Sequence, residues 1–93
     1  MKEYLGKIVS VRWIDSYMDS GWREIGDFTA GKLEIQSLGK VIYEDENVIS
    51  LAHNFASETD NTPQQANGIM TIPKLCILEV TCVCSPVASA IAQ

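Results

Sequence analysis

The sequence predicts an all-β fold, a small, strongly bent, SH3-like barrel of five strands with one short helical or 3₁₀ turn. Short apolar segments with period-two alternation are separated by clusters of turn-forming residues, which is typical of strands. Gly39 interrupts one of these segments, and a glycine within a strand often marks a bulge or a sharp bend. A proline-containing turn directly precedes the last apolar segment. An open five-stranded sheet packed on one helix is the alternative that these patterns leave open.

The expected elements follow one another along the chain without an internal repeat. Residues 7–15 are the clearest strand, because Val9, Val11 and Trp13 alternate with polar residues. A loop follows at 16–21, and Asp27 is expected to cap a short helical turn that Gly31 ends. The remaining expected elements are a strand at 32–44, an acidic turn at 44–47, its hairpin partner at 48–55, a long polar loop at 57–68, a short strand at 69–72 ended or placed at an edge by Pro73, a 3₁₀ turn at 73–76 and a last strand at 77–84.

Composition limits the classes of function that fit the chain. Its 93 residues suit one domain, here residues 1–84, followed by a tail at 85–93. A net charge of −5 with only seven scattered Lys and Arg residues argues against binding of DNA or RNA polymers. We expect neither a signal peptide nor a membrane span, and therefore a cytoplasmic protein with reduced thiols. The small core, the apolar tail and the three cysteines predict a homo-oligomer.

Metal binding and catalysis are not expected. Cys76, Cys82, Cys84 and His53 lack the spacing of a structural zinc site, and the cysteines fit thiols in the core of the last strand. The single histidine has no nucleophile motif beside it and is expected to be partly buried or on the surface. The aspartates of the first loop lack the EF-hand pattern and are expected to cap turns. The chain is therefore predicted not to be an enzyme and to need no cofactor.

The two tryptophans carry most of the functional information. Trp13 shares a strand face with two valines, so it is expected in the core. Trp22 follows Ser20 and Gly21, away from any apolar run, and is either a lid on the end of the barrel or a platform for stacking. Its neighbours include hydroxyls, carboxylates and guanidinium groups. The candidate ligand-binding residues are Arg12, Asp15, Ser16, Ser20, Trp22 and Arg23.

Several short motifs are distributed along the chain: Val11-x-Trp13-x-Asp15-Ser16, Gly21-Trp22, Ile35-x-Ser37-x-Gly39, Val41-Ile42-x-Glu44-Asp45, Ile49-x-Leu51-Ala52 and Ile72-Pro73-Lys74 with Ile77. In this order they resemble the motifs of small cytoplasmic proteins of tailed bacteriophages, most of which have no assigned function. They span residues 9 to about 83, nearly the whole predicted domain. The resemblance implies an early phage product that meets host factors in the bacterial cytoplasm, and it extends more weakly to the anti-CBASS sponges that sequester cyclic nucleotides.

Two classes of function fit these observations. The first is a non-catalytic sponge, an anti-defence protein that sequesters a small nucleotide signal at an interface between copies. In it Trp22 would stack on a base and Arg12 or Arg23 would meet phosphate. The alternative is a protein-interaction module that inhibits a host or phage protein, with Trp22 and Tyr17 as anchors. Both predict a binding protein in the host cytoplasm.

Overall fold

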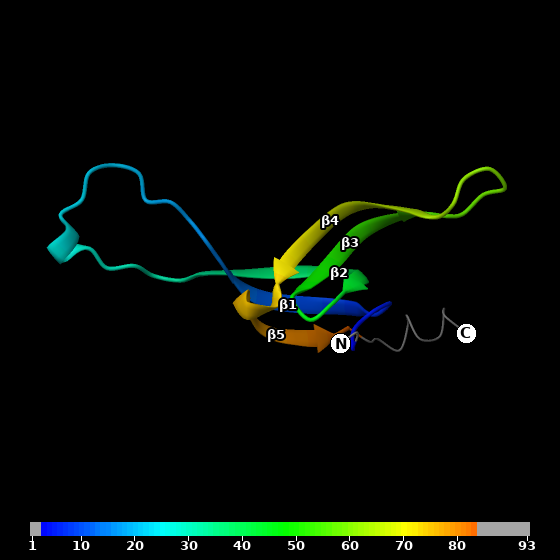
Figure 1. Ribbon diagram of the computed structural model, residues 1–93, viewed down its shortest axis with the longest axis horizontal. Helices are drawn as coiled ribbons and strands as arrows, with labels where there is room; N and C mark the ends of the chain where they lie inside the picture. Colours follow the sequence, from blue (N-terminus) through cyan, green and yellow to red (C-terminus); the bar gives the residue numbers. More distant parts are fainter. Residues whose placement is uncertain (1–2, 84–93) are drawn as a thin grey trace.

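The computed structural model describes residues 3–83, which form one sheet of five antiparallel strands (Figure 1). The order across the sheet is β4-β3-β2-β1-β5, so β4 and β5 are the edge strands. The elements are β1 (Ile8–Asp15), η1 (Ile25–Asp27), β2 (Leu33–Glu44), β3 (Val48–Ala56), β4 (Gln65–Pro73), η2 (Lys74–Cys76) and β5 (Ile77–Cys82), where η1 and η2 are 3₁₀ turns.

The predicted β-rich, barrel-like fold is confirmed. Within residues 3–83 the only helical elements are the two 3₁₀ turns, so the alternative with a packed helix does not apply. No ladder joins β4 to β5 among these residues, and the barrel-like sheet therefore keeps two edges. The more specific SH3-like assignment stays a prediction.

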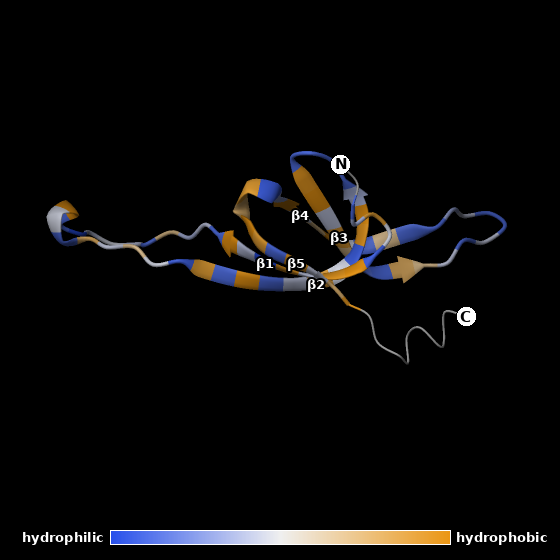
Figure 2. Ribbon diagram, turned by 90° about the horizontal axis from the view of Figure 1, so that it is seen from below, coloured by the Kyte–Doolittle hydropathy of each residue, from blue (hydrophilic) through white to orange (hydrophobic). Residues whose placement is uncertain are grey.

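The core lies on one face of the curved sheet. Alternation along β1 directs Val9 and Val11 to this face, and both are completely buried. Trp13 packs against the same cluster, and its indole Nε1 donates a hydrogen bond to Ser37 Oγ at 3.1 Å. The alternation of hydrophilic and hydrophobic residues along the strands is visible in Figure 2. The buried core residues are Val9, Val11, Val41, Ile49, Leu51, Ala52 and Ile72.

The bend of the sheet lies in β2, whose 12 residues pair with two different strands. Its first part pairs with β1 as far as Lys40, and its last part pairs with β3 from Lys40 to Glu44. The bulge lies between Val41 and Tyr43 rather than at Gly39, whose φ is not positive. Gly39 is instead required by close approach, since a Cβ atom there would lie 2.8 Å from the carbonyl oxygen of Ala52. The predicted bend is present, with a different physical cause.

Several predicted boundaries are wrong. The helical turn precedes its expected place, because Asp27 N–H bonds the Glu24 carbonyl and closes η1 instead of capping a later turn. β4 begins at Gln65, so the polar loop between β3 and β4 is shorter than expected and the connection at 16–32 is the longest among residues 3–83. Pro73 ends β4 at a sheet edge, as predicted. Cys84 and the 85–93 tail lie outside the described residues.

Candidate functional site

The longest connection projects from the sheet as an arm, defined here as residues 16–32 between β1 and β2. Figure 1 shows it running away from the strands at one end of the molecule, while the turn between β3 and β4 extends at the other. The radius of gyration is 17.7 Å, against about 12 Å expected for a compact domain of this length. The arm therefore presents its side chains to solvent, away from the core.

A pair of hydrogen bonds closes the base of the arm. The Tyr17 hydroxyl donates to the carbonyl oxygen of Gly31, and the Gly31 N–H donates back to the same hydroxyl, each at 3.0 Å. Asp15 Oδ1 accepts a hydrogen bond of 2.8 Å from the Ser16 N–H where β1 ends. Further out, Gly21 has a φ of 111°, a left-handed conformation that favours glycine. Side-chain hydrogen bonds and a glycine in a left-handed conformation thus shape the arm, which has no strand pairing.

The outer part of the arm exposes large apolar side chains. Trp22 is fully exposed, and the exposed fractions of Ile25 and Met18 are 92% and 87%. An open hollow of about 480 Å³ lies beside Trp22. Its lining residues are Asp19, Trp22, Arg23, Glu24, Asp27, Phe28 and Thr29. Arg23, the one cation of this lining, forms an ion pair of 3.2 Å with Asp19, so the hollow is acidic in net charge.

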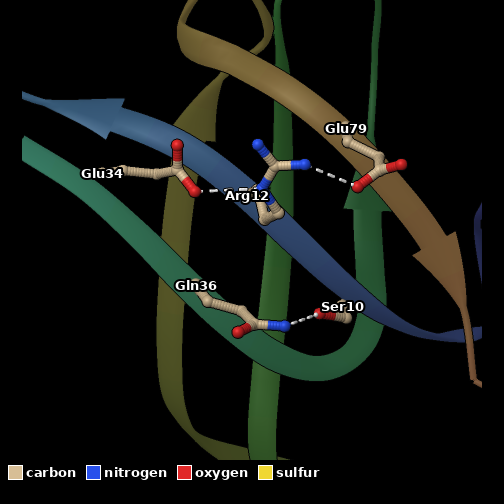
Figure 3. Close-up of polar contacts among 5 residues, drawn as sticks. All are labelled: Ser10, Arg12, Glu34, Gln36 and Glu79. Carbon is tan, nitrogen blue, oxygen red and sulfur yellow. Dashed lines mark hydrogen bonds and ion pairs between the residues drawn. The ribbon is translucent and has the colours of Figure 1, made fainter. Parts of the chain in front are cut away.

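The structure does not bring Arg12 to the arm. Arg12 lies in β1 between β2 and β5, where its guanidinium bonds Glu34 at 3.0 Å and Glu79 at 2.8 Å (Figure 3). Hydrogen bonding and charge attraction from Arg12 hold the pKa of Glu34 below its ordinary value. Beside it, Gln36 Nε2 donates to Ser10 Oγ at 2.9 Å. The Arg12 guanidinium, which the sequence predicts to bind a phosphate, is therefore paired with two carboxylates of the chain itself.

The other predicted ligand residues lie on the arm or at its base. Asp15 and Ser16 are joined by a hydrogen bond where β1 ends, Ser20 is exposed, and Arg23 binds Asp19. Trp22 and Arg23 line the same hollow, and the Trp22 side chain is fully exposed. Trp13 packs against the core, as predicted, whereas Trp22, which the sequence left as either a lid on the barrel end or a stacking platform, is fully exposed and covers no part of the sheet.

The groups considered for metal or acid–base chemistry remain apart. No cluster of three or more His, Cys, Asp or Glu side chains suited to a metal occurs in residues 3–83. His53 is exposed, Cys76 is half-buried, and Cys82 is exposed. The interpretation of Cys82 as a core thiol is therefore wrong, because β5 ends there at the sheet edge. Nor is any helix within those residues long and apolar enough to span a membrane.

Sequence reasoning missed a buried ion pair at the end of β2. The Glu44 side chain is only 1% exposed and accepts bonds of 2.8 Å from Lys74 Nζ and from the Tyr4 N–H. Burial by itself raises the pKa of Glu44, but these hydrogen bonds outweigh it and leave the pKa below its ordinary value. An apolar hollow of about 250 Å³ adjoins the pair. The sequence signal was a glutamate at the end of an otherwise apolar alternation.

Also missed was a surface patch at the bend of the sheet, called here the corner patch. It comprises Ile8, Leu38, Lys40 and Phe55, which line an open hollow of about 390 Å³ together with Gly39, the buried Ala52 and His53. Ile8 and Leu38 are about half exposed, and the Lys40 ammonium lies 5.3 Å from the centre of the Phe55 ring. No carboxylate lines this hollow.

Comparison with known proteins adds no relative: no family model matches the chain, and neither a curated protein nor a solved structure matches it. The resemblance to small phage proteins stays a prediction.

Proposed function

We propose that the chain is a non-catalytic protein-interaction module whose arm inserts apolar side chains into a host or phage protein. One observation carries this proposal: Trp22, Ile25 and Met18 stand almost fully exposed on a projecting arm. Large apolar side chains that no core residue covers are typical of interaction sites, and tryptophan is among the residues that contribute most at interfaces.

The way in which the arm is held supports binding. Ordering a segment on association costs conformational entropy, which weakens affinity. The paired bonds between Tyr17 and Gly31, together with the Asp19–Arg23 ion pair, restrict the arm before any partner arrives. Tyr17 therefore acts in the base of the arm rather than as the second anchor that the sequence suggested, and Ile25 takes the anchor's place beside Trp22.

Charge separates the two classes of function. A nucleotide needs unpaired positive groups at its phosphates, whereas the hollow beside Trp22 carries the carboxylates of Asp19, Glu24 and Asp27. Arg12 is paired with Glu34 and Glu79 in the sheet. Sequestration of a nucleotide signal stays a prediction, and these charges weigh against it. A protein surface with an apolar socket and a basic rim fits the arm better.

Site-specific photo-cross-linking tests the proposal. A photoreactive phenylalanine analogue replaces Trp22 in one variant and Leu75 in the control, since both side chains are fully exposed but Leu75 lies on η2 in the sheet domain. In cells of the bacterial host, we expect one defined protein to cross-link through position 22 and not through position 75. Equal labelling from both positions, or none from position 22, would contradict the proposal.

A further inference from the structure

We propose that two copies of the chain exchange arms, so that the arm tip of each copy covers the corner patch of the other. The arm tip is Trp22 with Ile25, and the corner patch is the surface around Ile8, Leu38 and Lys40 defined above. The proposal deepens the proposed function and rests on it, since the same arm that binds a partner protein would be masked by a second copy until that partner competes.

The dimensions of the chain allow a reciprocal exchange. The arm leaves the sheet at Asp15 and Leu33, and the corner patch lies at the opposite end of the β1–β2 ladder, where Ile8 pairs with Lys40. Seven residue steps separate Asp15 from Ile8, a distance of about 23 Å at about 3.3 Å per residue. Each side of the arm contains about eight residues and reaches at most about 26 Å. Reach and distance therefore match.

This match has a geometrical consequence. If a two-fold axis passes near the bases of the arms, each arm runs back along the other copy's strands and its tip arrives at that copy's corner patch. Both contacts are then identical, as closed two-fold symmetry requires. An arm much shorter or longer than the ladder would leave the tip over polar residues such as Arg12 or beyond the sheet.

Charge complementarity favours a second copy as the occupant. The arm tip is acidic, since Glu24 and Asp27 have no cation paired with them in the hollow that they line, where the one Arg is bonded to Asp19. The corner hollow is lined by Lys40 and His53 and by no carboxylate. In a chain of net charge −5, this is a surface on which an acidic arm meets the Lys40 ammonium instead of repulsion.

Apolar complementarity also favours a second copy as the occupant of the corner patch. Trp22 and Ile25 have no packing partners on the arm, and Ile8 and Leu38 expose half of their surface beside an open hollow. Covering both sets removes apolar area from water in two contacts at once. An indole also fits beside the Lys40–Phe55 pair, because an ammonium group attracts the face of an aromatic ring.

Mixing of two defective variants tests the exchange. Trp22→Glu disables the arm tip and Leu38→Glu disables the corner patch, and both side chains are exposed, so neither change should unfold the chain. Light scattering from 1 to 100 µM should give a dimer for the unaltered chain, and each variant alone should dissociate at least tenfold more readily. A mixture of the two variants retains one intact arm–patch contact, so we expect a heterodimer to form from them.

Leu75→Glu is the matched control, because Leu75 is as exposed as Trp22 but lies outside both surfaces. It should leave the dimer intact. A monomeric unaltered chain at 100 µM, a dimer that survives Leu38→Glu, or variants that do not complement each other on mixing would each overturn the exchange. Cross-linking of another protein through position 22 would still succeed in those cases, so the proposed function and the exchange fail separately.

Discussion

The sheet and the arm contain the same kinds of residue and use them in opposite ways. Each has one tryptophan, at position 13 or 22, and each has an ion pair. In the sheet, Trp13 packs on the core and bonds Ser37, while on the arm Trp22 contacts solvent. The difference lies in backbone pairing, since a strand fixes which face each side chain occupies and the arm has no such ladder. Stability therefore resides in the sheet, and the arm is available for recognition.

The tryptophans give the largest expected contrast. Trp13→Ala leaves part of the core unfilled and Ser37 without its indole donor, so we expect a loss of about 3 kcal/mol in the free energy of unfolding. Trp22→Ala should change it by less than about 0.5 kcal/mol, as is usual for exposed positions. Urea titration of both variants measures the contrast. Equal losses would mean that the arm packs on the sheet.

The glycines repeat the comparison at a smaller scale. Gly39→Val places a Cβ atom 2.8 Å from the Ala52 carbonyl oxygen, and overpacking of this kind costs about 2 kcal/mol. Gly26→Val on the arm meets nothing within 4 Å of its Cβ atom and should be nearly neutral. Thermal melting distinguishes the two. An unaltered melt for Gly39→Val would show that β2 and β3 separate there without cost.

The ion pairs come next. Lys74→Met leaves the buried Glu44 carboxylate with the Tyr4 N–H as its remaining hydrogen-bond donor among residues 3–83. Because the Lys74 side chain keeps 28% exposure, we expect a loss of about 1 to 2 kcal/mol, below the value for a fully buried pair. Arg23→Met removes the exposed pair of the arm and should leave the melting temperature nearly unchanged. A comparable fall for both would contradict the assignment of stability to the sheet.

The smallest effect is a dependence on pH. The pKa of Glu44 is lower in the folded chain than in the unfolded one, so the unfolded state binds more protons in acid. The stabilisation should be complete above the unfolded-state pKa of about 4.3 and should decline as pH falls through the lower folded-state pKa. Melting from pH 6 to pH 3 should show this decline, and Glu44→Gln should make it shallower. A parallel pH profile for Glu44→Gln would exclude Glu44 as its source.

The sequence predicted the elements whose positions depend on a local pattern of residues. β1, β2, β3 and the 3₁₀ turn before β5 lie within a residue or two of their expected places, because each alternating run or proline turn contains its own signal. β4 starts earlier than predicted because Ala66 and Asn67 continue the hairpin ladder opposite Phe55 and Asn54. Pairing extends a strand into polar residues that have no alternation of their own.

The candidate site depended on information that the sequence does not hold locally. Trp22 was identified because it stands apart from any apolar run. The sequence predicts that Arg12 binds a ligand, whereas in the fold Glu34 and Glu79 pair with it. These two carboxylates become its neighbours only through the registers of β1 with β2 and β5, which the sequence does not show. The corner patch likewise combines residues of three strands. Ion pairs between residues of different strands can be predicted only when the register of those strands is known.

The projecting arm also affects how the chain moves through solution. An elongated particle has a larger Stokes radius than a compact one of equal mass, so a single copy of this 10.3 kDa chain should migrate in gel filtration ahead of globular standards of its size. Two copies with exchanged arms would fold those projections against each other's sheets. The frictional ratio should therefore fall on association, even as the mass doubles, and sedimentation velocity would register both changes in one run.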